Sequence, residues 1–421
     1  MSGHKDVYAG GAVARYLLIG SAVALTLFGL VMIYSASSIT AAVREGSSWH
    51  FLLRQVVASI IGVAAAWALS RYDYRQLKGV SNIAWGVGIG ALIAVFAVAE
   101  ITNGSRRWIP LGVMNLQPSE VVKVICVLVV AAAAVDWMKG TVSTTQLMKR
   151  TAVIAGVPMV LIVLQPDLGT AVTLAAAVGL VLFMAGIEWK WIFASIGAVV
   201  VVAVLGILAE PYRVRRLTGF LDPFADPLGK GYQTVQALLA FGTGGVDGVG
   251  LGLSRQKFFY LPEAHTDFIL AIIGEEAGLL GTLFVIVAFG VFLWAGVKIA
   301  AGSRDTYGRL VAGALTGMLG LQAILNMAAV TGLMPVTGKP LPFLSYGGSS
   351  LLVTMISVGL ILSVSTYGAL APRAVRLKPR ATGPTSSKRK EPRREGSDQR
   401  RGNGRPRLSR VDGGRAARRR A

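Results

Sequence analysis

The feature that most constrains this chain is a succession of long apolar segments separated by shorter polar stretches. A helix of about 20 apolar residues crosses the roughly 30 Å hydrocarbon core of a bilayer. Only 15% of the residues are charged, against about 25% in an average soluble protein. We therefore expect an all-α, polytopic membrane protein with about ten transmembrane helices. The ten segments lie near residues 16–35, 51–70, 80–101, 118–136, 151–165, 168–187, 191–210, 267–297, 309–332 and 348–371.

Two of these segments have unusual lengths. The first has an apolar core of about 18 residues, longer than the 7–15 apolar residues typical of a signal peptide, and we interpret it as a retained first helix. The segment 267–297 is long enough to tilt, or to continue into an interfacial piece at the membrane surface.

The distribution of Lys and Arg predicts the orientation in the membrane. Positive residues favour the cytoplasmic side, and the segments 71–79 and 137–150 and the C-terminal tail carry an excess of them. With an even number of helices, both termini are then cytoplasmic. The predicted organisation is a cytoplasmic N-terminus (1–15), a membrane domain (16–371) with a large extracytoplasmic loop (211–266), and a basic tail (372–421).

The tail accounts for most of the formal net charge of +21. It holds eighteen Lys and Arg residues against four acidic ones, and almost no large apolar residues. Such a composition cannot bury a core, so we expect the tail to be disordered. We expect it to bind anionic lipid headgroups or an acidic cytoplasmic partner, and not nucleic acid.

Cysteine and histidine exclude two common kinds of site. Cys126 is the single cysteine, so no intramolecular disulfide can form. The three histidines, His4, His50 and His265, are too scattered for a zinc site of standard spacing. A glycine-rich run at 242–254 lacks the Gly-Lys-Ser/Thr ending of a phosphate-binding loop, which argues against nucleotide binding.

Polar residues gather in the predicted outer segments. Arg106 and Arg107 precede Trp108 in a short outer loop, where the distribution rule disfavours cations. Local packing or lipid phosphates account for them in one interpretation, and an anionic substrate does so in the other. Glu120 and Lys123 share a helix face, either as an ion pair that pins the helix or as a functional pair facing the interior.

Two aspartates begin predicted helices. Asp167 is either the N-cap of the sixth helix or a substrate contact. Asp267 opens an otherwise apolar helix, and we expect it to be the central residue of the site. Small residues on its face form either a groove for a lipid chain or a close helix contact, whereas Glu275 and Glu276 are expected to be structural. Those small residues are Ala271, Gly274, Gly278 and Gly281.

The last outer segment, 333–350, is rich in proline and glycine. Such a sequence predicts a broken or re-entrant segment. In a membrane protein this kind of backbone is tolerated only where it is buried in protein or lines a polar cavity.

Together these segments resemble the SEDS family (shape, elongation, division and sporulation proteins). The resemblance covers about residues 16–371, and its motifs occur in the order and spacing of the family. The run 260–268 is most similar to the division branch, FtsW, and its sporulation relative SpoVE, with the elongation branch, RodA, as the alternative. The matching motifs are Asn103–Trp108, Gln117–Lys123, Gln165–Thr170, Lys257–Gly278 and Pro340–Ser350.

The resemblance implies a peptidoglycan glycosyltransferase that polymerises lipid II at the outer face of the bacterial cytoplasmic membrane, in septal synthesis during cell division. A lipid II flippase, an elongation-type polymerase and a non-catalytic scaffold are the alternatives. The essential aspartate of the family falls on Asp267, as general base. The remaining predicted substrate contacts are Arg106, Arg107, Trp108, Glu120, Lys123, Asp167, Lys257, His265, Ser345 and Ser349.

The resemblance also implies partners. They are a class B penicillin-binding protein as transpeptidase, other divisome proteins and, for the tail, an acidic protein such as FtsZ. The pyrophosphate leaving group needs cations, for which Arg106, Arg107, Lys123 and Lys257 are the candidates. No cofactor is required, although a divalent cation could share this role.

Overall fold

The computed structural model describes residues 2–99, 107–110, 112, 114–208 and 217–368, with side chains from residue 12 onward. Arg106, the start of the large outer loop and the basic tail lie outside the described residues, so the expectations for them stay predictions. The described residues belong to one compact unit, Met1–Leu377.

Ten helices of the described part are long and apolar enough to cross a membrane. The prediction of an all-α protein with ten transmembrane helices is therefore confirmed. Two short strands, β1 (Ile109–Pro110) and β2 (Asn115–Leu116), form an antiparallel pair. The helices are α1 (Ser2–Glu45), α2 (His50–Arg71), η1 (Tyr74–Gln76), α3 (Leu77–Val98), α4 (Pro118–Met138), α5 (Thr144–Leu164), α6 (Leu168–Ala185), α7 (Trp189–Leu208), α9 (Tyr232–Gly244), α10 (Ile269–Glu276), α11 (Gly278–Gly302), α12 (Thr306–Val330), α13 (Gly348–Ser363) and η2 (Val364–Gly368).

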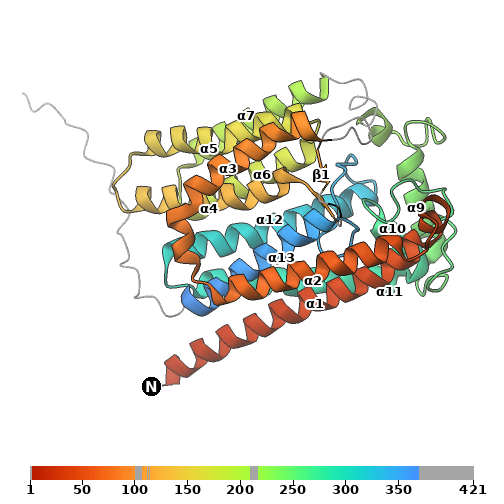
Figure 1. The fold of residues 1–421 in the computed structure, drawn as a ribbon, viewed down its shortest axis with the longest axis horizontal. Coiled ribbons are helices and arrows are strands. Elements are labelled where there is room, and N and C mark those ends of the chain that lie inside the picture. Colours follow the sequence, from red (N-terminus) through yellow and green to blue (C-terminus); the bar gives the residue numbers. More distant parts are fainter. Residues whose placement is uncertain (1, 100–106, 111, 113, 209–216, 369–421) are drawn as a thin grey trace, which may run out of the picture. The chain divides into compact units, whose positions relative to one another are not determined.

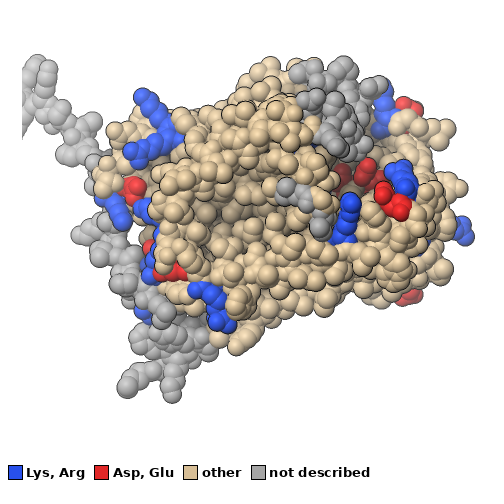
Figure 2. All heavy atoms as spheres, viewed as in Figure 1, with Lys and Arg blue, Asp and Glu red and all other residues tan. Residues whose placement is uncertain are grey.

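The helices differ in how deeply they are buried. α4, α12 and α13 are the most enclosed, while α7 is almost entirely exposed and would face lipid. α13 packs along α2, α1 along α11, and α6 lies against both α4 and α12 (Figure 1). On the face seen in Figure 2, charged side chains gather toward the two ends of the helices and leave an uncharged band between them. This band is what a bilayer requires of a surface that contacts it.

Local sequence explains where several helices begin. Pro118 occupies the first turn of α4, where its missing N–H is not needed. The fifth helix starts at Thr144, earlier than the predicted 151, because Ser143 and Gln146 form a capping box at its N-terminus. Its first two turns are polar and were therefore not part of the apolar segment.

The predicted eighth helix, 267–297, is instead two helices, which corrects the expectation of one continuous segment. α10 ends at Glu276, and the chain turns at Ala277 and at Gly278, whose φ of +62° favours glycine. The membrane span starts only at Gly278.

Of the two interpretations of the small residues on this face, the structure supports close packing and not a groove for a lipid chain. A Cβ atom added to Gly274 would lie 2.3 Å from the ring of Phe241, and one added to Gly278 would lie 2.4 Å from the backbone of Val246. The small residues therefore allow α9 and the loop that follows it to pack tightly against α10, which was the alternative interpretation. The turn at Gly278 also prevents Gly281 from sharing one helix face with Ala271.

Candidate functional site

A network of buried charges forms where α4 begins. Lys123 Nζ lies 2.9 Å from Glu120 Oε2, and their side chains are 1% and 3% exposed. Lys123 also donates to Gln322 Oε1 of α12 at 3.2 Å. The pair therefore pins α4 to α12 inside the protein, and a substrate role for Glu120 and Lys123 stays a prediction.

Lys339 is the centre of this network. It lies in the segment between α12 and α13, and its Nζ is 3.3 Å from Glu120 Oε1 and 3.1 Å from Asp167 Oδ2. Its side chain is 4% exposed. Sequence reasoning identified the proline-rich segment as buried but missed this residue; the available signal was a lone cation in a segment expected to be enclosed. We call Glu120, Lys123, Asp167 and Lys339 the Lys339 network.

Asp167 has the N-cap role that was one of its two predicted roles. Its Oδ1 accepts from the backbone N–H of Thr170 at 3.1 Å, and its Oδ2 accepts from the side chain of Gln117 at 2.7 Å. Burial acts to raise the pKa of Asp167, but Lys339, Arg107 and the Thr170 hydrogen bonds together lower it to about 2. A substrate role for Asp167 stays a prediction.

The same pairing affects the cation. Burial acts against the charge of Lys339, but Asp167 and Glu120 raise its pKa above the usual value. Asp167 and Lys339 therefore remain charged at neutral pH and hold α6 against the segment before α13.

Arg107 lies at the edge of the Lys339 network and is partly exposed. Its guanidinium donates to the carbonyl oxygens of Gln165, at 3.0 Å, and Pro166, in the turn between α5 and α6. It also lies 5.9 Å from the centre of the Trp108 ring. Local contacts thus orient the guanidinium, while its charge still contributes to lowering the pKa of Asp167.

Asp267 is joined to this network through Asn326 of α12. The Asn326 side-chain amide donates to the backbone oxygen of Asp267 and to that of Lys339, both at 2.8 Å. Asp267 itself is partly exposed, whereas Asn326 is buried. One amide group therefore fixes the predicted base next to the segment that carries Lys339. Sequence reasoning did not identify Asn326, because an amide within an apolar helix gives no sign of its partners.

His265 lies two residues before Asp267, in a group of rings. Its ring centre is 4.7 Å from that of Phe51 in α2 and 5.6 Å from that of Tyr346. The backbone N–H of Tyr346 donates to the oxygen of His265 at 2.9 Å. Burial lowers the pKa of His265, so the imidazole is neutral at pH 7. These contacts join the segment before α10 to the segment before α13.

Ser345 and Ser349 both bind backbone groups. The hydroxyl of Ser345 accepts from Leu341 N–H at 2.8 Å. The hydroxyl of Ser349 accepts from Gln117 N–H at 2.8 Å and donates to Asn115 O at 2.6 Å. Both serines lie near the Lys339 network, but their hydroxyls hold the loops together, and direct substrate contact by them stays a prediction.

Lys257 does not join the Lys339 network. It pairs with Glu276 at 3.0 Å, and the two side chains are 3% and 0% exposed. The hydroxyl of Ser35 in α1 donates to the same carboxylate. Glu275 and Glu276 were expected to be structural, and their complete burial fits that expectation. Among the described residues, no three His, Cys, Asp or Glu side chains are grouped as a metal site would need; the role of a divalent cation stays a prediction.

Residues 15–369 match the sequence model of the FtsW/RodA/SpoVE family, described as cell cycle proteins. The chain belongs to this SEDS family. It is 39% identical over 354 residues to stage V sporulation protein E of Bacillus subtilis, covering 83% of this chain and 96% of that one. It is 38% identical over 361 residues to the probable peptidoglycan glycosyltransferase FtsW of Geobacter metallireducens, covering 84% and 96%.

Two solved SEDS-type folds resemble this one. One comes from work on the structural coordination of polymerization and crosslinking by a peptidoglycan synthase complex, with a TM-score of 0.69, 29% identity and coverage of 83% of this chain and 97% of that one. The other is the rod shape determining protein RodA of Thermus thermophilus, with a TM-score of 0.62, 26% identity and coverage of 83% and 96%. The resemblance found in the sequence is thereby confirmed, and so is the fold.

Proposed function

We propose that this chain polymerises lipid II into glycan strands at the outer face of the bacterial cytoplasmic membrane, with Asp267 as the general base. The chain is a multi-pass membrane protein and a SEDS-family peptidoglycan glycosyltransferase. What we add is the substrate, the side of the membrane and the role of the aspartate.

The proposed reaction needs one base and one source of positive charge. The carboxylate takes the proton of the acceptor sugar 4-hydroxyl, whose oxygen attacks the anomeric carbon of the donor as the polyprenyl pyrophosphate leaves. General-base catalysis of this kind contributes roughly 10²–10⁴-fold to the rate. Inversion at the anomeric carbon requires no covalent intermediate with the enzyme.

The observation that carries the proposal is the link from Asp267 through Asn326 to the Lys339 network. A general base must be held in place and must also reach its substrate. The backbone oxygen of Asp267 accepts from the Asn326 side chain at 2.8 Å, and the residue is partly exposed. This arrangement suits a preorganised base, because Asn326 also binds the segment that carries Lys339 and so fixes the distance between that segment and Asp267.

The positions of the cations revise their proposed roles. Lys123 and Lys257 lie in buried ion pairs, so we assign to them the positioning of helices and not the direct binding of pyrophosphate. Arg107 is partly exposed at the edge of the Lys339 network. Among the described residues, it remains the candidate that would bind the anionic leaving group. Arg106 is the second candidate.

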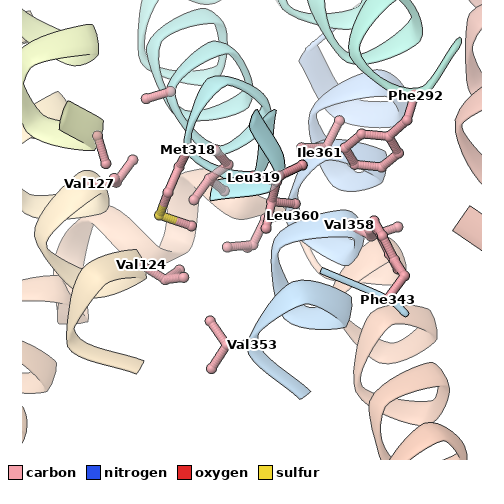
Figure 3. Packing of buried hydrophobic residues seen from close by; sticks show 14 of the residues in the cluster. Val124, Val127, Phe292, Met318, Leu319, Phe343, Val353, Val358, Leu360 and Ile361 are labelled. Atoms are coloured by element: carbon pink, nitrogen blue, oxygen red, sulfur yellow. The ribbon is translucent and has the colours of Figure 1, made fainter. Parts of the chain in front are cut away.

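An apolar cavity between α4 and α13 would receive the lipid part of the substrate. Its volume is about 170 Å³ and only apolar residues line it, among them Val121 and Val124 next to the Glu120–Lys123 pair. Val124 from α4 and Val353 from α13 point toward the space between the two helices (Figure 3). A polyprenyl chain entering from the bilayer would occupy this space between the two helices.

The distribution of polar groups supports polymerisation over flipping of lipid II. Between Lys123 and Asp136, α4 carries only apolar residues. The hydroxyls of Thr316 and Ser357 in α12 and α13 each donate to a carbonyl of their own helix at 2.7 and 2.8 Å. A flippase would need a polar path through this half of the membrane domain.

We further propose a septal role and a crosslinking partner. Relatives named FtsW and stage V sporulation protein E share 38% and 39% identity with the chain, against 26% for the RodA of known structure. A polymerase needs a transpeptidase beside it, for which a class B penicillin-binding protein is the candidate, with other divisome proteins around the pair. The basic tail would bind anionic lipid or an acidic partner such as FtsZ.

Purified full-length chain, with its transpeptidase partner if required, and labelled lipid II test the proposal. We expect glycan strands from the wild type and from Asp247→Asn, which makes the same change at an exposed loop residue, and none from Asp267→Asn. Full polymerisation by Asp267→Asn would disprove the role of the base. Transfer of lipid II across vesicles without glycan strands would favour a flippase. A fluorescent fusion located along the side walls, and not at the septum, would favour an elongation role.

A further inference from the structure

α10 is a short helix between the proposed base and a second group of buried charges. It spans Ile269–Glu276, and all eight of its residues are buried. Asp267 lies just before its first turn, and its last turn ends in two glutamates, about 12 Å away along the helix axis. Because the chain turns at Gly278, α11 does not continue the axis of α10. The direction of α10 therefore depends on its packing against α9 and α1 and on the polar contacts at its two ends.

Glu276 is held from two other parts of the chain. Its carboxylate accepts from the Ser35 hydroxyl at 2.7 and 2.6 Å and pairs with Lys257 Nζ at 3.0 Å. Lys257 Nζ donates in addition to the backbone oxygen of Gly252 at 2.6 Å. We call Ser35, Lys257, Glu275 and Glu276 the Glu276 cluster.

Glu275 holds the loop before α10 through the backbone. Its carboxylate accepts from the N–H groups of Arg255 and Gln256 at 3.0 and 3.3 Å. Its own carbonyl accepts from Val249 N–H at 2.9 Å. The end of α10 is therefore enclosed by residues 249–257 on one side and by α1 on the other, so α10 cannot tilt without breaking several buried bonds.

We propose that the Glu276 cluster is a positioning device for glycan polymerisation. It holds the far end of α10 and thereby keeps Asp267, at the near end, in contact with Asn326. This proposal rests on the proposed function of Asp267. Glu276 acts through the helix and is a positioning residue. An error of about 1 Å in the placement of a reacting group lowers a rate by about 100-fold, so a slight tilt of α10 is sufficient.

The test is Glu276→Gln in the full-length protein, with initial rates measured over a range of lipid II concentrations. We expect kcat to fall by about 10- to 100-fold with an almost unchanged KM, since substrate contacts remain while the base is displaced. Asp305→Asn is the control: Asp305 caps α12 and accepts from Tyr74 Oη at 2.8 Å, away from α10. It should lower the melting temperature and leave kcat unchanged.

A second variant separates positioning from mere loss of stability. Glu276→Gln leaves the Lys257 charge buried and unpaired, and adding Lys257→Met removes that charge, so the double variant should regain part of kcat. Amide hydrogen exchange in the segment 267–276 should rise in Glu276→Gln and fall again in the double variant. If Glu276→Gln does not fold, Ser35→Ala gives the milder version of the same test.

Three results would overturn the proposal. The first is an unchanged kcat in a folded Glu276→Gln or Ser35→Ala protein. The second is a kcat of the double variant that is lower than that of Glu276→Gln. The third is amide hydrogen exchange in the segment 267–276 that is the same in Glu276→Gln and in the wild type. Each differs from failure of the proposed function. If the proposed function fails, Asp267→Asn polymerises lipid II at the full rate. If only the positioning proposal fails, Asp267→Asn remains inactive.

Discussion

Lys339→Met is the most direct test of the Lys339 network. Lys339 Nζ lies 3.1 Å from Asp167 and 3.3 Å from Glu120, and all three side chains are 3% or 4% exposed. Methionine keeps the length of the side chain but removes the charge, which leaves two buried carboxylates with one remaining lysine, Lys123. Breaking a buried pair in this way costs about 3–5 kcal/mol. A loss of this size is a large share of the roughly 5–15 kcal/mol that stabilises a typical protein.

The pKa of Asp167 gives a second measure of the same interaction. Its usual value of 3.8 falls to about 2 in the folded protein, equivalent to about 2 kcal/mol. Because the pKa is lower in the folded state, this stability is present above pH 3.8 and is lost as the pH falls toward about 2. Removal of Lys339 raises the pKa of Asp167 in the folded state, so the variant should lose less stability than the wild type as the pH falls below 3.8.

Denaturation in mixed detergent micelles measures this effect. Lys78→Met is the matched control, because Lys78 pairs with Asp136 at 2.9 Å but the side chains are 36% and 38% exposed. Exposed pairs contribute about 0–1 kcal/mol, so the control should unfold almost as the wild type does. A double variant, Asp167→Asn with Lys339→Met, restores the charge balance and should recover part of the loss. Equal destabilisation by Lys78→Met and Lys339→Met would refute the reasoning.

Three further changes have defined outcomes. Asn326→Asp replaces a hydrogen-bond donor by a carboxylate that repels the backbone carbonyl of Asp267. It should lower kcat in a polymerisation assay about tenfold or more, while a melting assay shows that the protein remains folded. Gly244→Ala places a Cβ atom 1.9 Å from a carbonyl of α10 and should reduce the yield of folded protein in size-exclusion chromatography, whereas Gly242→Ala meets nothing within 4 Å and should not. Burial lowers the pKa of His265, so its contribution to stability is present above about pH 6.5 and declines below it; the melting temperature of His265→Phe should fall less between pH 7 and 5 than that of the wild type.

Much of the fold is predictable from the sequence because the bilayer imposes the length and polarity of its helices. All ten segments of the apolar pattern correspond to helices. The break at Gly278 was missed because α10 is itself mostly apolar and is followed directly by an apolar helix. Only the tertiary contact with Val246 and Phe241 reveals that α10 packs against protein and not against lipid.

The site was predictable to a lesser degree. Motifs identified Asp267 and the Glu120–Lys123 pair, since charges are unusual in apolar segments. Lys339 and Asn326 act on partners far along the chain, and no local pattern encodes such contacts. Lys257 was grouped with Asp267 because the two are close in sequence. Its side chain instead contacts Ser35 of α1 and Glu276.

The charge balance of the Lys339 network explains which cations are left for a substrate. Glu120 and Asp167 offset Lys123 and Lys339, so the buried group is neutral as a whole and needs no further counter-ion. Within the described residues, Arg107 donates to the carbonyl oxygens of Gln165 and Pro166, which do not neutralise its charge. The excess positive charge of the described site therefore lies at its partly exposed edge, and not in the interior where the two lysines lie. An anionic leaving group would be attracted to that edge. This supports the proposal that the buried charges position the site and that Arg107 contacts the substrate, while Asn326 holds the backbone of the proposed base, Asp267.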